Sequence, residues 1–177
     1  MKRFLNIFFI LHFLLFLFAV NLHSQVSQPV SAIGHVIAEV IPVFTASETS
    51  QLNFGRFAPG PQGGEIIITP ESTISVLGSV YNAPGIHNAA SFYLSGDPNA
   101  TYSINLPSAP VILTNVSNAK TMQIRDWMSI PASGFGTGLL RNGFQIVYVG
   151  ATLKVGTLVD NPVGIYTGTY NITFDFN

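Results

Sequence analysis

Residue types that carry out enzyme chemistry are sparse and scattered in this chain of 177 residues. Outside the first 24 residues, the only histidines are His35 and His87. His35 precedes Glu39 by four residues on one face of an expected strand, a separation of about 13 Å. That distance is too long for a general-base pair or a shared metal ion. We therefore interpret His35 as an exposed strand histidine, and His87 as a loop histidine that could reach a ligand.

The eight carboxylates also stand singly, and no cysteine is present. No Asp-x-Asp-x-Asp-Gly run marks an EF-hand calcium loop, and cysteine-rich zinc sites are excluded. Asp97 and Asp160 lie beside Asn and Pro, which indicates turns in which the carboxylate caps its own backbone. Two acids could meet in space as a glycosidase pair, but the sequence does not show one. We predict a protein that is not an enzyme and holds no metal or cofactor.

Motifs for nucleophilic catalysis and phosphate binding are absent as well. The chain has no Gly-x-Ser-x-Gly nucleophile elbow. Residues 134–138 (GFGTG) superficially resemble a phosphate-binding loop. They lack the Lys-Ser/Thr pair, and no helix is expected after them to hold an anion at its N-terminus. We interpret residues 134–143 as a flexible hairpin loop.

The remaining candidates for contact with a ligand or partner are aromatic residues and one histidine. Aromatic rings on strands and loops can form a platform for carbohydrate, although most strand aromatics fill a sandwich core. Trp127 is of particular interest because it lies beside Arg125 and Asp126. The candidate contact residues are Trp127, Tyr81, Tyr93 and His87.

Segments with a period of two, bounded by turn residues, recur along the chain and must position these side chains. No segment after residue 24 shows an uninterrupted helical pattern. About eight to ten strands at this spacing predict an all-β, immunoglobulin-like antiparallel sandwich in a single domain, residues 25–177. A turn is expected at residues 59–64. The clearest strands are expected at residues 32–41, 91–95, 102–106, 144–156 and 166–176.

Composition limits the partners of such a domain. Charged residues make up 8% of the chain, and its net charge is −1. Without the first 24 residues, five basic and eight acidic residues remain, so the net charge becomes −3. This excludes a strongly basic nucleic-acid binder, an acidic disordered chain and a long coiled coil. Outward strand positions carry Thr, Asn and Ser, and such a surface is suited to association through sheet edges.

The first 24 residues have the pattern of a secretory signal peptide. Two basic residues precede an apolar stretch from Phe4 to Val20, and a small residue, Ser24, precedes a polar start. We predict cleavage after Ser24; the alternative is an uncleaved membrane anchor at the short end of spanning length. No later run is long enough to span a membrane. The mature protein is therefore expected in the periplasm, on the outer-membrane surface or outside the cell.

Three runs carry a resemblance to a known family: residues 52–55 (LNFG), 96–104 (GDPNATYSI) and 161–174 (NPVGIYTGTYNITF). Together they are similar to a bacterial exported domain of unknown function, DUF4402, over residues 31–177. That family in turn resembles spore coat protein U and the fimbrial subunits of the chaperone–usher pathway. The resemblance implies an immunoglobulin-like sandwich at the envelope of a Gram-negative bacterium, and it supplies no catalytic residues.

The chain departs from fimbrial subunits in two ways. It lacks the disulfide that they usually carry. They also bear an N-terminal extension that completes a neighbour's fold by strand addition, whereas only residues 25–30 precede the first expected strand here. Either residues 32–41 are themselves donated or, as we expect, the domain is self-complete.

Two functions follow as hypotheses. The first is a structural envelope or surface subunit that associates with itself, or with other envelope subunits, by strand-edge contacts. The second is a module that binds surface glycans through the aromatic residues named above.

Overall fold

A computed structural model describes residues 29–41 and 43–176 of the chain. The expected signal peptide, residues 1–24, lies outside the described residues. The chain divides into two units, Met1–Glu39 and Val40–Asn177. Within the described ranges there is no helix long and apolar enough to cross a membrane.

The second unit is built from antiparallel strands, and its described residues form no helix. This confirms the predicted all-β sandwich, with eleven strands instead of eight to ten. They are β1 (Thr45–Ser50), β2 (Arg56–Ile68), β3 (Ile74–Ala83), β4 (Ala90–Ser95), β5 (Thr101–Asn105), β6 (Val111–Asn115), β7 (Thr121–Ile130), β8 (Gly134–Leu139), β9 (Phe144–Val155), β10 (Tyr166–Thr167) and β11 (Thr173–Phe176).

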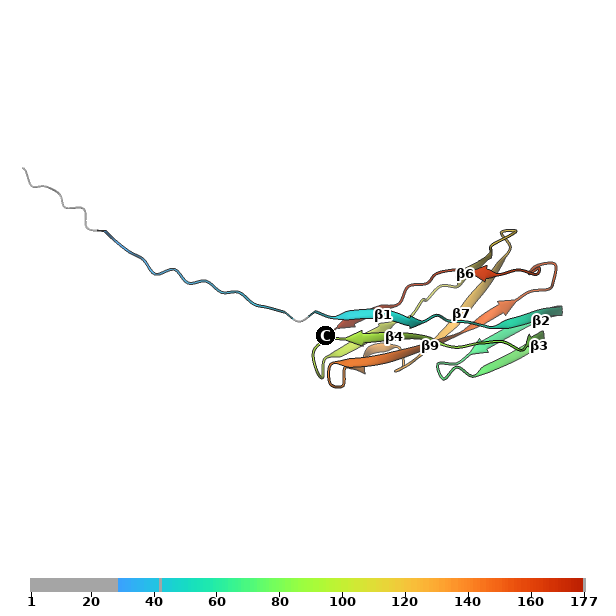
Figure 1. Cartoon of the computed structure of the whole chain (residues 1–177), viewed down its shortest axis with the longest axis horizontal. Coiled ribbons are helices and arrows are strands. Elements are labelled where there is room, and N and C mark those ends of the chain that lie inside the picture. Colours follow the sequence, from blue (N-terminus) through green and yellow to red (C-terminus); the bar gives the residue numbers. More distant parts are fainter. Residues whose placement is uncertain (1–28, 42, 177) are drawn as a thin grey trace, which may run out of the picture. The chain divides into compact units, whose positions relative to one another are not determined.

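The strands form a large sheet and a small one (Figure 1). The large sheet has the order β1-β4-β9-β7-β6-β10, and the β2–β3 hairpin joins it through β9. The small sheet has the order β11-β5-β8. Strand β9 is central: β7 pairs along one of its edges, and β4 and then β2 pair along the other. Residues 149–153 of β9 are buried on both faces, whereas Phe144, Ile146 and Tyr148 in its first half leave one face exposed.

Two apolar clusters form the core. One is built from residues of β2, β7 and the second half of β9, such as Ile66, Ile124 and Leu153. The other joins β4, the small sheet and the first half of β9, with Leu94 and Tyr102 fully buried. Side chains that contact both clusters, Leu52 and Trp127 among them, link the two into one core.

Residues 59–64, where the sequence pattern predicts a turn, lie within β2. The structure instead continues the strand through this segment, with a shift in its pairing to β3 between Pro59 and Gly63. Gly63 has φ +66, and a side chain there would meet the carbonyl oxygen of Val155 at 2.4 Å. The turn residues therefore serve as a bulge that bends β2 back along β9.

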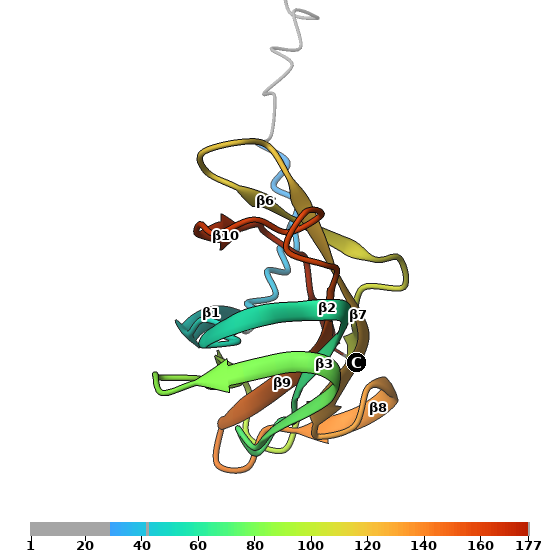
Figure 2. The same ribbon diagram turned by 90° about the vertical axis from the view of Figure 1, so that its right-hand side faces the viewer.

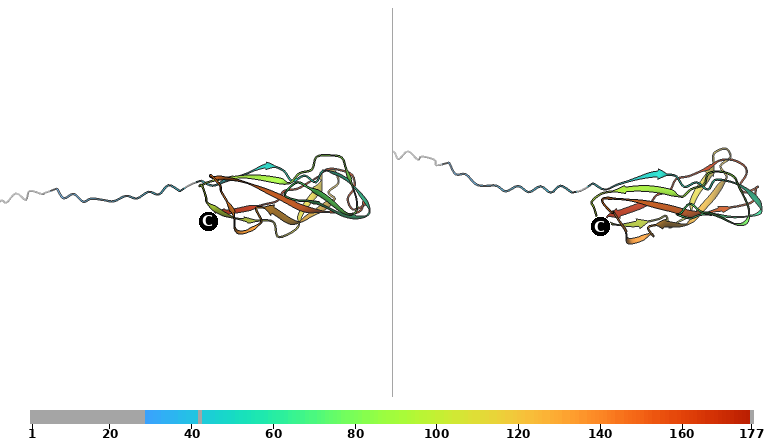
Figure 3. Two further views of the ribbon diagram at one scale, coloured as in Figure 1. Left: turned by 90° about the horizontal axis from the view of Figure 1, so that it is seen from below. Right: turned by 60° about the horizontal axis from the view of Figure 1, so that its bottom comes forward.

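Two other predictions need correction. Residues 134–139, expected in a flexible loop, form β8, because Gly138 leaves room for the ring of Tyr102 on β5. The closing strand expected over residues 166–176 is two short strands: β10 pairs with β6 in the large sheet, and β11 pairs with β5 in the small sheet. The chain thus passes from one sheet to the other between residues 168 and 172 (Figure 3).

Residues 32–41, expected to form the first strand, have no regular secondary structure. The alternating pattern is present, but the structure provides it with no paired strand. The prediction of a strand within this chain's own fold was therefore wrong at this point.

Candidate binding groove

A groove of about 1310 Å³ runs along the second unit. One wall is residues 48–59, which contain the end of β1 and the start of β2. The opposite wall is residues 162–170, which contain β10. Figure 2 shows β1 and β2 on one side of this space and β10 on the other.

The walls include the two edges of the large sheet. Among the described strands, β1 pairs only with β4, and β10 pairs only with β6. The sheet curls until these two edges face each other across the groove. Each wall therefore carries backbone N–H and C=O groups along an edge that no strand of this sheet covers.

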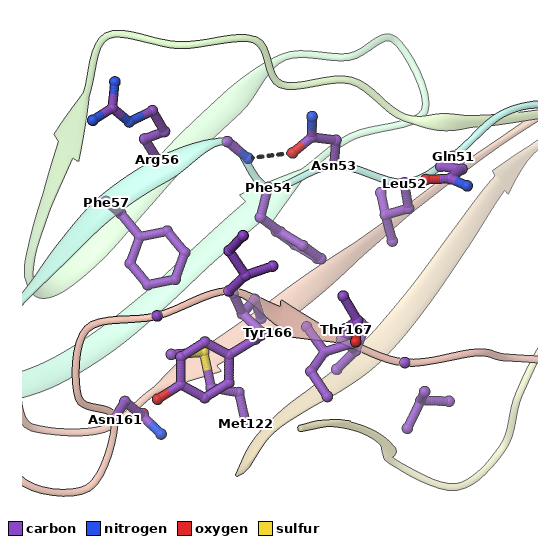
Figure 4. A pocket seen from close by; sticks show the side chains of 18 of the residues that line it. Gln51, Leu52, Asn53, Phe54, Arg56, Phe57, Met122, Asn161, Tyr166 and Thr167 are labelled. Carbon is purple, nitrogen blue, oxygen red and sulfur yellow. Dashed lines mark hydrogen bonds between the residues drawn. The ribbon is translucent and has the colours of Figure 1, made fainter. Parts of the chain in front are cut away.

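The floor of the groove is apolar. Phe54, Met122, Ile124 and Leu153 are buried beneath it, and partly buried side chains of Leu52, Phe57, Leu113 and Tyr166 complete it. Figure 4 shows Phe54, Phe57, Met122 and Tyr166 converging on the same space, while Arg56 points away from it. Such a floor favours an apolar occupant over a charged one.

Strand β1 is exposed on the face that should be covered by a second layer. Ala46 and Glu48 pair with Leu94 and Phe92 of β4, which point into the core. Yet every residue of β1 except Ser50 is exposed. Of this inner face, Glu48 lines the groove.

Two buried polar atoms at this end of the domain lack a hydrogen-bond partner among the described residues: Trp127 Nε1 and Tyr170 Oη. The two rings pack with centroids 4.6 Å apart. Burial, and to a smaller extent the charge of Glu48, raises the pKa of Tyr170 above its usual range. The hydroxyl therefore stays protonated, and it can donate a hydrogen bond at any physiological pH.

Two asparagines fix the wall opposite β1 and β2. The Asn161 amide accepts a hydrogen bond from the Gly156 backbone N–H at 2.5 Å and donates one to the Thr121 carbonyl at 2.8 Å. Asn115, also buried, accepts one from the Ser117 backbone N–H. Large apolar side chains stay exposed on this wall and its loop: Leu158, Val159, Val163 and Ile165.

Residues 30–40, which form the end of the first unit and the first residue of the second, carry exposed apolar side chains. Val30, Ile33, Val36, Ile37 and Val40 are 89–95% exposed. Small apolar residues occupy every second position from Val30 to Val40 apart from Gly34, and the only ionisable side chains in the stretch are His35 and Glu39. A contiguous apolar stretch of this kind indicates an interaction segment.

The structure does not place the sequence-predicted contact residues in the groove. Trp127 on β7 is half-buried and packs between the two core clusters. Tyr81 is 65% exposed on β3, and His87 is partly buried in the loop before β4. Tyr93 on β4 is 39% exposed and stacks with Phe144 of β9 at 6.1 Å. These four side chains lie on different elements, and none lines the groove.

The residues that do line the groove overlap two of the runs that carry the family resemblance, 52–55 and 161–174. The signal that could have identified them is the repeated placement of Leu, Phe and Tyr on segments interrupted by Gly and Pro. Reasoning from catalytic residue types missed them because the groove contains a single acid, Glu48, and a single base, Arg56. No group of His, Cys, Asp or Glu in the described part of the chain could hold a metal ion.

The fold and the groove define an antiparallel β-sandwich domain whose large sheet leaves two opposed edges open. The chain belongs to the family described as domain of unknown function (DUF4402), which matches residues 44–176. Residues 29–43 lie outside that match. Comparisons with curated proteins and with solved structures give no significant match.

Proposed function

We propose that this protein is a non-enzymatic structural subunit of the bacterial envelope or cell surface, which associates with further copies of itself or with other envelope subunits. The observation that carries this proposal is the open apolar groove between two unpaired strand edges. An edge that exposes backbone hydrogen-bonding groups readily pairs with another chain.

The distribution of charge supports the same proposal. The groove walls and floor contain only two charged residues, Glu48 and Arg56. Little charge therefore has to be desolvated when a second chain covers them. The N-terminal pattern of a secretory signal peptide supports an exported location, where a chain without cysteine forms no disulfide.

Sedimentation velocity tests the proposal. The full-length gene, with its leader, is expressed in a Gram-negative host, and the exported protein is purified and compared over a hundredfold range of concentration. We expect discrete oligomers that grow with concentration and persist as a ladder in unboiled gels. A single monomeric species throughout would contradict the proposal.

One observation favours a second candidate function, glycan binding. Tyr93 and Phe144 stack on the outer face of β4 and β9, next to the exposed Tyr148 and Ile146. Exposed rings beside serine and threonine hydroxyls are suited to a neutral polysaccharide. If this candidate is right, Tyr93→Ala will weaken retention on a polysaccharide column at least tenfold. Equal retention of variant and parent would remove it.

A further inference from the structure

We propose that residues 30–40 of one copy occupy the groove of a second copy of this chain as an added β-strand, which runs antiparallel to residues 162–170. This inference rests on the proposed function and names the partner and the direction of insertion. It departs from the self-complete domain that the sequence favours.

The segment is comparable in number of residues to the two walls of the groove. Eleven residues in a β-strand extend over about 36 Å, and the facing walls are residues 48–59 and 162–170. The segment is followed within its own chain by β1, which begins at Thr45. Residues 41–44 therefore form a short connection from the inserted strand to the next domain.

The side chains of the segment match the groove in polarity. In a strand, alternate side chains face opposite sides. One set consists only of Val, Ala and Gly, at positions 30, 32, 34, 36, 38 and 40. The other set contains both ionisable residues, His35 and Glu39, together with Ile33 and Ile37. The first set can face the apolar floor without burying a charge, and the second set then lies toward solvent.

The backbone of the segment supplies hydrogen-bonding partners for the two unpaired strand edges. β1 and β10 each pair on one side only, so an inserted strand has hydrogen-bonding groups available on both of its sides. Exposed strand edges commonly bind an extended peptide in this way. The inserted strand would join the two ends of the large sheet and cover the exposed inner face of β1.

Chain connectivity determines the direction. At one end of the groove Tyr170 lies against Phe92, the residue that pairs with Glu48, and at the other end Pro59 lies near Leu158. The domain's own β1 starts beyond the Glu48 end, where Phe44 stacks with Phe176 at 4.1 Å. If the inserted strand leaves at the Pro59 end, the donor domain begins beyond the acceptor, and successive copies extend head to tail. The opposite direction brings the donor domain to the end where the acceptor's own segment leaves, and the two would compete for space.

The charges favour the same direction. Glu48 is the only acid that lines the groove, and Arg56 is its only base. With residue 40 at the Pro59 end, Glu39 lies far from Glu48 and on the side of Arg56. The opposite direction brings the two carboxylates together.

Adjacent substitutions in the segment test which face is buried. Val36 and Ile37 are 94% and 93% exposed, so an aspartate at either position leaves the packing of the domain core unchanged. In the full-length exported protein, we expect Val36→Asp to lower the oligomeric fraction at least tenfold. Ile37→Asp, the matched control on the solvent side, should stay within about twofold of the parent. Equal effects of the two variants would overturn the inference.

Engineered cysteines test the partner and the direction, because the parent chain contains no cysteine. Glu39→Cys combined with Ile165→Cys, near the Pro59 end of the groove, should give a reducible ladder of covalent multimers after mild oxidation. Glu39→Cys combined with Glu48→Cys, at the other end, should give none. The reverse pattern, or no ladder in either variant, would overturn the inference. A disulfide confined to single chains would also overturn it, because the segment would then fill its own groove.

The two proposals can fail separately. If the parent remains monomeric in sedimentation, both fail. If the parent assembles and Val36→Asp assembles equally well, the structural function stands and the strand insertion is wrong.

Discussion

Tyr102 shows how the domain accommodates a polar atom in a core that contains no charge. Its side chain is fully buried, and its hydroxyl donates a hydrogen bond to the side-chain carbonyl of Gln145 at 2.7 Å. The same Gln145 oxygen accepts a hydrogen bond from the Leu139 backbone N–H. Burial raises the pKa of Tyr102 to about 12 from its ordinary value of 10. The phenol is therefore harder to ionise in the folded than in the unfolded chain.

A raised pKa of this kind makes stability depend on alkaline pH. Its contribution is complete below pH 10 and is lost as the pH rises toward about 12, because the unfolded chain then releases the proton more readily. We expect Tyr102→Phe to lower the free energy of unfolding at pH 7 by about 1 kcal/mol, and to lose less stability than the parent between pH 10 and 12. Urea denaturation at several pH values measures both. An identical pH dependence in variant and parent would contradict the assignment.

At the scale of elements, the loop between β9 and β10 holds the wall of the groove, and Asn161 is its main attachment. Asn161→Ala would leave the Gly156 N–H and the Thr121 carbonyl without their partner. We expect a loss of about 1–3 kcal/mol in unfolding free energy, together with weaker assembly. The control is Asn118→Ala, whose side chain caps an exposed turn and should cost less than about 0.5 kcal/mol. Thermal unfolding compares the two, and equal losses would contradict this role of Asn161.

The sequence pattern predicted strands well where each expected strand corresponds to a single strand of the structure. Residues 91–95, 102–106 and 144–156 alternate or run apolar, and they correspond to β4, β5 and β9. It was less successful where Gly and Pro have a tertiary role. Gly63 permits the bend within β2, and Gly138 accepts the ring of Tyr102, so residues that usually end strands lie inside them. Local propensity cannot reveal such contacts between distant residues.

At the scale of the whole molecule, the groove could not be predicted, because its two walls are about 110 residues apart in the sequence. The walls meet only because the sheet curls from β1 through β9 to β10. The alternation of residues 32–41 predicted a strand within this chain's own fold, where the structure has none. In the proposed assembly, residues 30–40 of one copy bind the apolar groove of a second copy. The small number of charged residues, which excluded a nucleic-acid binder in the sequence, also suits a surface that associates with a second chain.

Hydrogen exchange of the backbone amides of residues 30–40 tests the central claim most directly. The measurement compares the assembled parent protein with the Val36→Asp variant, at equal concentration and neutral pH. We predict slow exchange across this segment and across residues 166–170 in the parent, because both gain strand pairing, and fast exchange in the variant. Fast exchange of residues 30–40 in fully assembled protein would contradict the account, since the segment would then be unpaired in the very state that it is proposed to build.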